Sequence, residues 1–294
     1  MSIVKSLSVG DGDMFYIKHG NDNFTIIDCC MSEENKYDIV RELIYQSKSK
    51  GITRFISTHP DDDHFCGIKY LNQNMPIRNF YCVKNEAAKS EETDDFKEYC
   101  ALRDDSKKVF YLAEGCSRRW LNQGNGERGA SGIHILWPIT TNEHYREELT
   151  KAKEGNSFNN ISIIMKYSLN DGAKILWMGD LETDFMEKIK DEIIIDAADI
   201  LFAPHHGRDS GKVPADWLES INPKIVIIGE APSEELNYYT GYNTITQNSA
   251  GDIILECVSG KTHIYVSNPD YSVDFLDDKN MPDTYGKYIG TLTV

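Results

Sequence analysis

The sequence predicts an α/β fold, and three observations support this prediction. Short apolar runs that end at polar or glycine-containing corners, "KILWMGD", "ILFAPHHG" and "KIVIIGE", alternate with helical patterns. Hydrophobic residues make up 40% and charged residues 27% of the chain, which is typical of a soluble globular protein. A length of 294 residues is enough to bury a substantial core.

The first part of the chain predicts a strand meander followed by a helix. The apolar runs "SIVKSLSV", "MFYIK" and "FTIIDC" are separated by the turn-forming segments "GDGD" and "HGNDN". Residues 32–48 place Val40, Leu43 and other apolar side chains at helical spacing, and Gly51 follows just beyond. This pattern predicts an amphipathic helix that covers the sheet. "RFIST" then predicts a short strand, and "FCGIKYL" predicts the start of the next helix.

The later part predicts two more helices and a hairpin. "LETDFMEKIKDEI" and "VPADWLESI" are helical patterns between strands, and "GDIILECVSGKTHIYVSN" predicts a hairpin that turns at Ser259-Gly260. Residues 84–132 break the alternation with acidic "SEETDDFKEYC", the basic pair Arg118-Arg119 and a glycine-rich loop. We therefore expect one domain over residues 1–294, with an insertion at about 84–132.

Composition excludes several classes of protein. No apolar run approaches the roughly 18 residues of a membrane-spanning helix, and the first ten residues lack the features of a signal peptide, so we expect a cytoplasmic protein without membrane contact. Seven scattered cysteines without a CxxC pair indicate neither a disulfide framework nor a zinc knuckle. A net charge of -16 argues against binding polyanions through a broad basic surface, so a phosphate substrate would need local attraction.

The segment "STHPDDDHFCG" concentrates histidine and aspartate and has three possible interpretations. A solvated acidic loop gives no reason for a histidine at each end, at His59 and His64. A calcium loop of the EF-hand type would need a glycine at its sixth and a glutamate at its twelfth position, and both are absent. A metal centre fits better, because Asp61 at the alternate position turns to the side of His59, while Asp63 and His64 reach a second ion.

Two further clusters of ligand-type residues follow at matching places. Asp180 ends the predicted strand "KILWMGD", and the pair His205-His206 follows the predicted strand "ILFAP". Open α/β sheets build their sites from residues at the ends of buried strands. Together with the first segment, these clusters predict a dinuclear metal centre.

Segments along nearly the whole chain resemble the metallo-β-lactamase superfamily. They are "VGDGDMFYI", "TIIDCC", "THPDDDHFCG", "NNISIIMKYSLNDGAKILWMGDLE", "APHHGRDSG" and "NPKIVIIGE", followed by "TITQNSAGDIIL", in the order of the family. Within the superfamily, the chain is most similar to the branch of the ComEC nuclease-like domain and the phosphorylcholine esterases. The resemblance implies a four-layer αββα sandwich, with the site along one edge between the two sheets.

The resemblance also implies which residues bind metal. Seven positions would contribute, all of them histidine or aspartate: His59, Asp61, Asp63, His64, Asp180, His205 and His206. His59 and Asp61 would hold a first ion, and Asp180 would bridge it to the second. One histidine of the 205–206 pair would bind the second ion and the other would serve substrate or proton transfer, in an order that the sequence leaves open. Asp28 would orient the metal-binding loop by hydrogen bonds.

The chain departs from the superfamily pattern at several positions. Most members have histidine where Asp61 stands and a further histidine ligand before the bridging aspartate. In that region this chain has Asn159, Asn160 and Ser162 instead, as the ComEC-like branch does. The resulting oxygen-rich site shifts preference toward manganese, although zinc retains the higher intrinsic affinity. Arg208 replaces the serine that usually follows "HHG", and its guanidinium would clamp a phosphate in bidentate fashion.

These features predict a phosphodiesterase or nuclease that uses two divalent ions, zinc or manganese, on nucleic acid or a nucleotide. Asp63, His205, His206 and Arg208 are the expected catalytic residues. Two alternatives stay open: a hydrolase of an ester, lactone or thioester, which uses the same chemistry on carbonyl carbon, and a binding module that has lost activity. Metal content and a substrate panel distinguish them.

Overall fold

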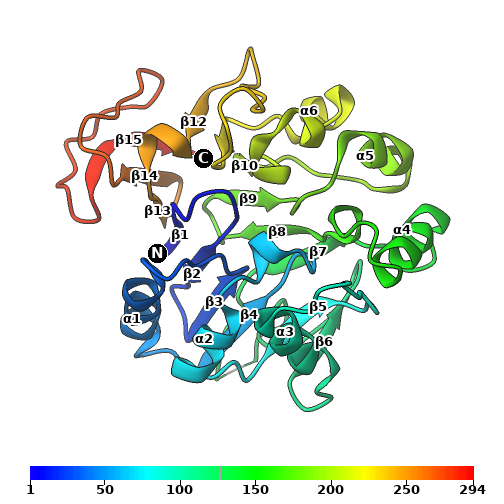
Figure 1. Cartoon of the computed structure of the whole chain (residues 1–294). Helices are drawn as coiled ribbons and strands as arrows, with labels where there is room; N and C mark the ends of the chain where they lie inside the picture. Colours follow the sequence, from blue (N-terminus) through cyan, green and yellow to red (C-terminus); the bar gives the residue numbers. More distant parts are fainter. Residues whose placement is uncertain (126) are drawn as a thin grey trace.

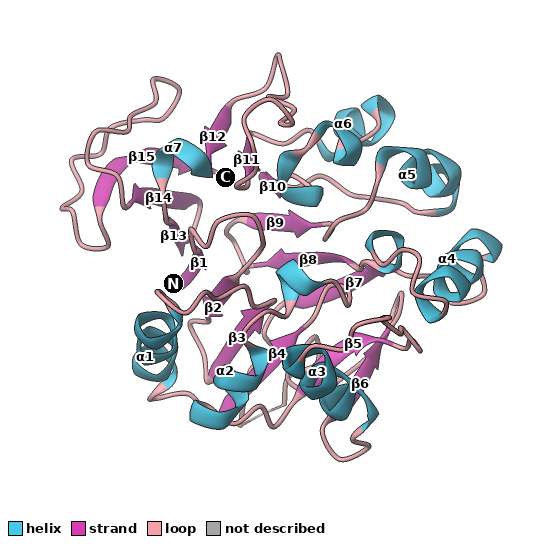
Figure 2. Ribbon diagram, viewed as in Figure 1, coloured by secondary structure: helices cyan, strands magenta, loops and turns pink. Residues whose placement is uncertain are grey.

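The computed structural model describes residues 1–125 and 127–294 of the chain (Figure 1). In this part of the chain the strands form two sheets, of nine and six strands. Figure 2 shows helices α1 to α3 below the strands and α4 to α6 on the right, with strands β14 and β15 at the left edge. The layers are thus helix, sheet, sheet and helix, which is the four-layer αββα sandwich expected from the sequence.

The larger sheet combines an antiparallel half and a parallel half. In spatial order its strands are β15 (Lys287–Thr293), β14 (Lys261–Val266), β13 (Ile253–Val258), β1 (Ser2–Ser6), β2 (Phe15–Lys18), β3 (Asn23–Ile27), β4 (Ile52–Ile56), β5 (Phe80–Val83) and β6 (Val109–Leu112). Neighbours from β15 to β3 pair antiparallel, and those from β3 to β6 pair parallel. The carboxyl ends of β3, β4 and β5 therefore share one edge.

The smaller sheet has a similar division. Its strands, in spatial order, are β12 (Thr244–Thr246), β11 (Ile225–Ile228), β10 (Ile200–Phe202), β9 (Lys174–Trp177), β8 (Ile164–Ser168) and β7 (Ile133–Trp137). Strands β9 to β12 pair parallel, whereas β7, β8 and β9 pair antiparallel. The carboxyl ends of β9 and β10 consequently open on a common edge, where parallel sheets place their ligands.

Helices cover the outer face of each sheet. Helices α1 (Lys36–Ser47), α2 (Ile68–Asn74) and α3 (Asp94–Asp104) pack on the larger sheet, and α4 (Glu143–Lys153), α5 (Thr183–Ile189) and α6 (Ala215–Ile221) pack beside the smaller one. The short helix α7 (Gln247–Ala250) precedes β13. No helix among the described residues has the length and apolar character needed to cross a bilayer.

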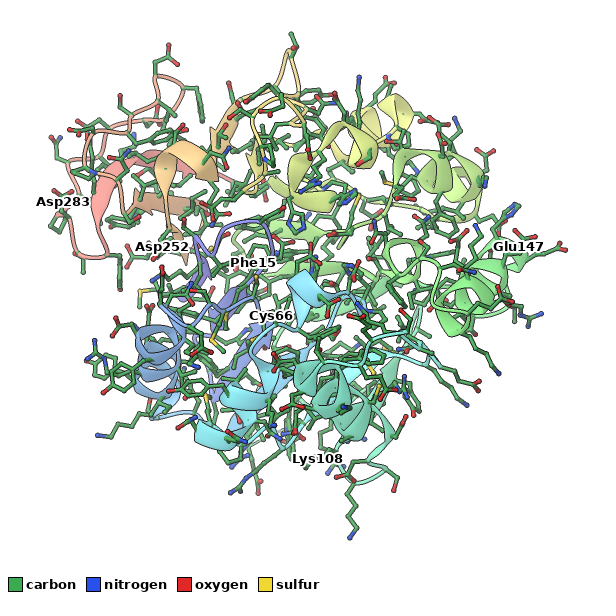
Figure 3. The ribbon with its side chains drawn as sticks, viewed as in Figure 1. Phe15, Cys66, Lys108, Glu147, Asp252 and Asp283 are labelled. Carbon is green, nitrogen blue, oxygen red and sulfur yellow. The ribbon has the colours of Figure 1, made fainter. Side chains whose placement is uncertain are left out.

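The core lies between the sheets and under α1 to α3, as the period-two alternation of the strands requires. In β5, Tyr81 and Val83 face the space between the sheets, while Phe80 and Cys82 face the helices. Phe15 lies at the centre, with ring centroids 6.1 Å from Trp177 and 4.9 Å from Phe202 across the sheet interface (Figure 3). Burial of such aromatic side chains fixes how the two sheets, and hence their edges, face each other.

Several predicted elements occur at the expected places. The helix expected over 32–48 is α1, which begins at Lys36, and the hairpin turns between β13 and β14, at Ser259-Gly260. The stretch 84–132 includes residue 126, which lies outside the described residues. The stretch 84–132 contains α3 and β6, and β6 pairs with β5 as the edge strand of the larger sheet. The part of this stretch up to residue 112 thus continues the sheet.

Candidate metal centre

The site lies where loops from both sheets meet. The loop after β4 supplies His59 and His64, the turn after β9 supplies Asp180, and the turn after β10 supplies His206. Asp13 joins them from the loop between β1 and β2. Residues more than a hundred positions apart in the sequence are therefore neighbours at this edge.

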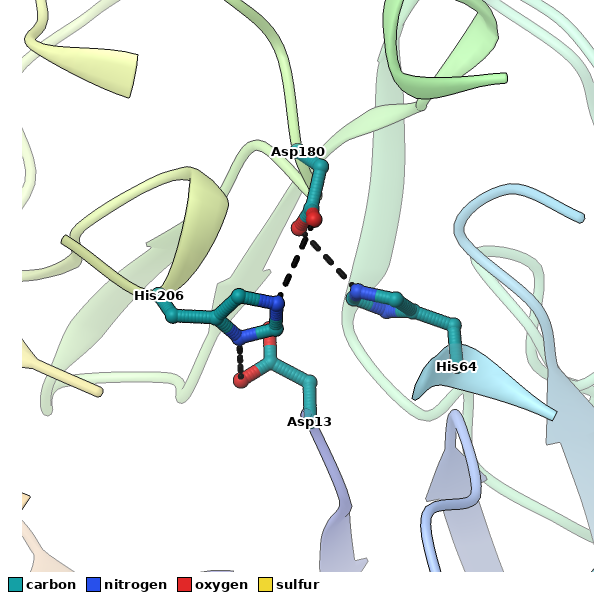
Figure 4. A group of neighbouring side chains, drawn as sticks. All are labelled: Asp13, His64, Asp180 and His206. Atoms are coloured by element: carbon teal, nitrogen blue, oxygen red, sulfur yellow. Dashed lines mark hydrogen bonds and ion pairs between the residues drawn. The ribbon is translucent and has the colours of Figure 1, made fainter. Parts of the chain in front are cut away.

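Four of these side chains form a group that we call the four-residue cluster: Asp13, His64, Asp180 and His206 (Figure 4). Each offers one ligand atom, and these atoms all lie within 4.8 Å of one another. Asp180 is central, with Oδ1 at 3.1 Å from Nε2 of His64 and Oδ2 at 3.3 Å from Nε2 of His206. Nδ1 of His206 lies 3.2 Å from Oδ1 of Asp13.

Unsatisfied buried atoms at this place test whether the residues fit a metal ion. Among the described residues, Nε2 of His59 is buried without a hydrogen-bond partner, and Nε2 of His64 and Oδ1 of Asp180 are buried with no partner beyond their 3.1 Å contact with each other. A buried polar atom left in this way costs about 1–3 kcal/mol. Imidazole nitrogen and carboxylate oxygen are the ligands that zinc and manganese accept. The donor set thus fits a divalent ion, whose coordination would satisfy these atoms.

Asp180 lies among three histidines that favour its charged form. Burial would raise the pKa of Asp180, but His64, His206 and His59 outweigh burial and hold it well below its usual range. Burial also acts against ionisation of Asp63, yet its hydrogen bond with His206 and the charge of His64 lower the pKa to about 2. Both carboxylates are therefore charged at neutral pH, as metal ligands must be.

The three histidines differ in their protonation. Burial would lower the pKa of His64, but the carboxylates of Asp180 and Asp28 raise it well above the usual value. The pKa of His206 is raised in the same way, because Asp180 and Asp13 outweigh its burial. For His59, burial and the charge of His64 lower the pKa to about 4. In the metal-free protein, His64 and His206 therefore carry protons that an ion would displace.

Asp28 holds the loop after β4 from beneath, as the resemblance implies. Its Oδ1 accepts from the backbone N–H of Thr58 at 2.8 Å, and its Oδ2 accepts from Oγ1 of Thr58 at 2.6 Å. The same Oδ2 lies 2.9 Å from Nδ1 of His64. Asp28 has a positive φ of 56°, an uncommon conformation for aspartate that places the carboxylate under the loop. This arrangement directs Nε2 of His64 toward Asp180.

The expected first-ion position is built differently from the four-residue cluster. Nε2 of His59 lies 3.9 Å from Oδ2 of Asp180. Oδ1 of Asp61 accepts from the Lys89 ammonium at 2.8 Å and from the backbone N–H of Asp62 at 2.9 Å. In the described part of the chain, neither His59 nor Asp61 belongs to a group of three or more ligand-type side chains whose ligand atoms all lie within 4.8 Å of one another.

Asp63 lies beside the four-residue cluster. Its Oδ2 is 3.2 Å from Nε2 of His206, and its Oδ1 is 3.9 Å from Nε2 of His64. The carboxylate thus lies beside both histidines of the four-residue cluster.

The adjacent histidines after β10 take different places. Both have positive φ values, 54° for His205 and 56° for His206, a strained conformation that occurs at functional sites. His206 is buried in the four-residue cluster. His205 has a side chain that is 17% exposed, with Nε2 at 4.0 Å from Oδ2 of Asp180 and Nδ1 at 2.9 Å from Oγ of Ser210. The geometry therefore favours His206 as ligand and leaves His205 at the opening.

Arg208, which we expected to clamp a phosphate, is paired with carboxylates. Its Nη2 lies 2.6 Å from Oδ1 of Asp11, and its Nη1 lies 2.8 Å from Oε2 of Glu235. Both partners lie on exposed loops, with about half of each side chain accessible. The guanidinium is thus close to the site but already neutralised.

Asn159 and Asn160 support the turn after β9. Nδ2 of Asn160 donates to Oε2 of Glu182 at 2.9 Å, and the backbone N–H of Glu182 donates to Oδ1 of Asn160 at 3.1 Å. Asn159 contacts the same carboxylate at 3.4 Å. The backbone N–H of Asp180 donates to Oγ of Ser162. These contacts fix the position of Asp180 through its neighbours.

Asp13 is the member of the four-residue cluster that sequence reasoning missed. The segment "GDGD" predicts a turn between strands, and a turn explains aspartate without any ligand role. The available signal was the larger segment "VGDGDMFYI", which belongs to the family resemblance. The backbone N–H of Asp13 donates to the carbonyl oxygen of Asp63, so the two loops are joined directly.

No protein-family model matches the chain, and no curated protein sequence matches it. Among solved structures, the metallo-β-lactamase SMB-1 in complex with mercaptoacetic acid is similar at 13% identity and a TM-score of 0.39, over 68% of this chain and 76% of that chain. BJP-1, a subclass B3 metallo-β-lactamase of Bradyrhizobium japonicum, is similar at 12% identity and a TM-score of 0.35, over 68% and 71%. At such TM-scores the fold assignment rests on the layers and strand order of the chain itself.

Proposed function

We propose that the chain is a metal-dependent hydrolase of the metallo-β-lactamase superfamily and that its substrate is a phosphodiester. The observation that carries the proposal is the four-residue cluster, in which ligand atoms from four separate loops lie within 4.8 Å of one another. Nε2 of His59, which is buried beside Asp180 without a hydrogen-bond partner, supports a bound cation.

The chemistry follows from this donor set. Asp13, His64, Asp180 and His206 would hold a divalent ion, with Asp63 beside them. A divalent ion supplies Lewis acidity and positive charge, which activate water and stabilise the negative charge that develops on the substrate. The strained turn at residues 205–207 and the hydrogen bonds of Asp28 hold the protein groups in place before the substrate binds.

His205 is the group best placed to move a proton. Its side chain is partly exposed, and the contact of Nδ1 with Oγ of Ser210 fixes the direction of Nε2. A histidine at the opening would give a proton to the leaving oxygen of the substrate. His206, which is buried and bound on both ring nitrogens, has no such freedom.

Arg208 could bind a phosphate substrate only if a phosphate oxygen replaced Asp11 or Glu235 as its partner. Its contacts with Asp11 and Glu235 involve half-exposed carboxylates, and exposed ion pairs contribute at most about 1 kcal/mol. A phosphate oxygen would replace one of them through a charge-assisted hydrogen bond. The net charge of -16 favours a nucleotide or a short single strand over long duplex DNA.

The second candidate is hydrolysis of a carboxylic ester, lactone or thioester. The specific observation that favours it is the neutralised Arg208, because a neutral substrate needs no guanidinium. The same donor set would serve attack on carbonyl carbon.

A substrate panel with zinc and with manganese tests the proposal. Bis-nitrophenyl phosphate, single-stranded DNA, RNA, cyclic dinucleotides and simple lactones would be offered to the wild type and to Asp180→Asn. We expect phosphodiester hydrolysis that Asp180→Asn reduces by at least about a hundredfold, with a loss of bound metal. Asp196→Asn is the matched control, because this side chain is 76% exposed. Turnover of lactones alone would favour the second candidate, and no bound metal would refute the metal centre.

A further inference from the structure

Lys89 brings a positive charge to the expected first-ion position. Its Nζ lies 2.8 Å from Oδ1 of Asp61 and 2.6 Å from Oδ2 of Asp62. Only 11% of the Lys89 side chain is exposed. An ammonium this far from solvent needs such partners, because an unpaired buried charge is strongly unfavourable.

Three aromatic rings surround the same ammonium. Nζ of Lys89 lies 4.6 Å from the ring centroid of Phe158, 5.2 Å from that of Phe65 and 5.8 Å from that of Phe96. The negative face of an aromatic ring attracts a cation within about 6 Å. These rings also belong to three different segments of the fold, so the packing of the core determines where the ammonium lies.

Hydrogen bonds also fix the backbone between the end of β5 and Lys89. Lys89 follows β5, whose parallel pairing with β4 brings the two loops side by side. The backbone N–H of Ala88 donates to the carbonyl oxygen of Ala152 at the end of α4, and the Arg103 guanidinium donates to the carbonyl oxygen of Ala87. The pairing of β5 with β4 and the contacts with α3 and α4 thus position Lys89 beside Asp61.

A metal ion at the first-ion position would compete with this ammonium. Asp61 gives one oxygen to Lys89, and among the described residues neither Asp61 nor His59 belongs to a group of three or more ligand-type side chains whose ligand atoms all lie within 4.8 Å of one another. A divalent cation held by Asp61 would lie close to the Lys89 ammonium, and two like charges in a partly buried site repel strongly.

We propose that the ammonium of Lys89 replaces the first ion, so that the centre binds one divalent ion instead of two. The inference rests on the proposed function, since it assumes that the four-residue cluster binds metal. Lys89 neutralises Asp61 and keeps it away from metal, while the bound ion lies among Asp13, His64, Asp180 and His206. An ion pair between Lys89 and Asp61 thus takes the place of a metal ion at the first-ion position.

Counting bound ions tests this inference without any activity assay. Metal-free protein would be titrated with Mn²⁺ and the free ion followed by electron paramagnetic resonance, with zinc content after dialysis as a second measurement. We expect one ion per wild-type chain. Lys89→Met keeps the apolar contact with the rings but removes the charge, so Asp61 is released and the count should rise to two. Lys89→Arg keeps a cation and should still bind one.

Two further variants serve as controls. Lys153→Met removes a charge from an ion pair with Glu86 on the surface, where the lysine side chain is 64% exposed, and should still bind one ion. Asp61→Asn should also keep one ion, because Asp61 is not a ligand in this arrangement. Thermal unfolding with and without Mn²⁺ checks that each variant is folded, and Asp61→Asn tests the inference independently if Lys89→Met does not fold.

The outcomes separate this inference from the proposed function. Two ions in the wild type, an unchanged count in folded Lys89→Met, or a loss of metal in Asp61→Asn would each overturn the role of Lys89 and leave the metal centre intact. A wild type that binds no ion would refute the proposed function itself.

Discussion

Nδ1 of His64 lies 2.9 Å from Oδ2 of Asp28, and both side chains are fully buried. A carboxylate at Nδ1 requires a proton on that nitrogen, so Nε2 is the nitrogen that remains for a metal ion. Nε2 in turn lies 3.1 Å from Oδ1 of Asp180. The contact between Asp28 and His64 thus determines which ring nitrogen of His64 points into the site.

Asp28→Asn should therefore weaken metal binding although Asp28 is not a ligand. An amide NH₂ toward Nδ1 of His64 would favour the tautomer with a proton on Nε2, which cannot bind metal. We expect the Kd for Mn²⁺ to rise by about tenfold to a hundredfold. Asp196→Asn, at an exposed position, is the control. An unchanged Kd would show that Asp28 does not set the tautomer.

Asp13→Asn should weaken metal binding as well. Oδ1 of Asp13 lies 3.2 Å from Nδ1 of His206, and Asp13 belongs to the four-residue cluster. As a ligand or as the partner of His206, it should contribute about tenfold or more to metal affinity. The control is Asp11→Asn in the same loop, where the side chain is 56% exposed. Equal affinities in the two variants would exclude Asp13 from the centre.

Metal affinity should rise with pH, and binding should release protons. The pKa values of His64 and His206 are raised well above the usual range by the carboxylates that outweigh burial, so both rings are protonated in the metal-free protein. An ion needs neutral imidazole and must displace these protons. His59, with a pKa of about 4, has no proton to release near neutral pH.

Calorimetry in two buffers of different ionisation enthalpy measures this release. The heat of Mn²⁺ binding should differ between the buffers, and lower pH should weaken binding because protons compete for the same nitrogens. The same heat in both buffers, with an affinity independent of pH, would contradict the protonation that we assign to His64 and His206.

Arg208→Ala should distinguish the two candidate substrates. If the guanidinium exchanges Asp11 or Glu235 for a phosphate oxygen, kcat/KM on a phosphodiester should fall by about tenfold, or roughly 1.4 kcal/mol. A carboxylic ester offers no such anion and should be affected less. The measurement is kcat/KM for both substrates with the same enzyme preparation. Small and equal effects would leave Arg208 as a structural ion-pair partner and would remove one support for a phosphate substrate.

The α/β layering and the positions of most ligand-type residues follow from local patterns in the sequence. Strands and helices have local patterns, and His59, His64 and Asp180 each follow a strand whose apolar run is visible in the sequence. The sequence thus placed these residues at the ends of buried strands, where open α/β sheets build their sites, and the packing of the two sheets brings the end of β4 to the end of β9. The local patterns did not indicate α3 and the edge strand β6 within 84–132, nor helix α4 and strand β15.

The tertiary structure decided which of these residues contact one another. Asp13 meets His206 only because β1 and β2 bring their loop to the opposite sheet. Lys89 reaches Asp61 only because β5 pairs with β4. The adjacent residues His205 and His206 are distinguished by two successive positive φ values that turn one ring inward and leave the other at the opening. Such contacts depend on sheet order, packing and backbone strain, which act between distant segments and leave no local periodicity in the sequence.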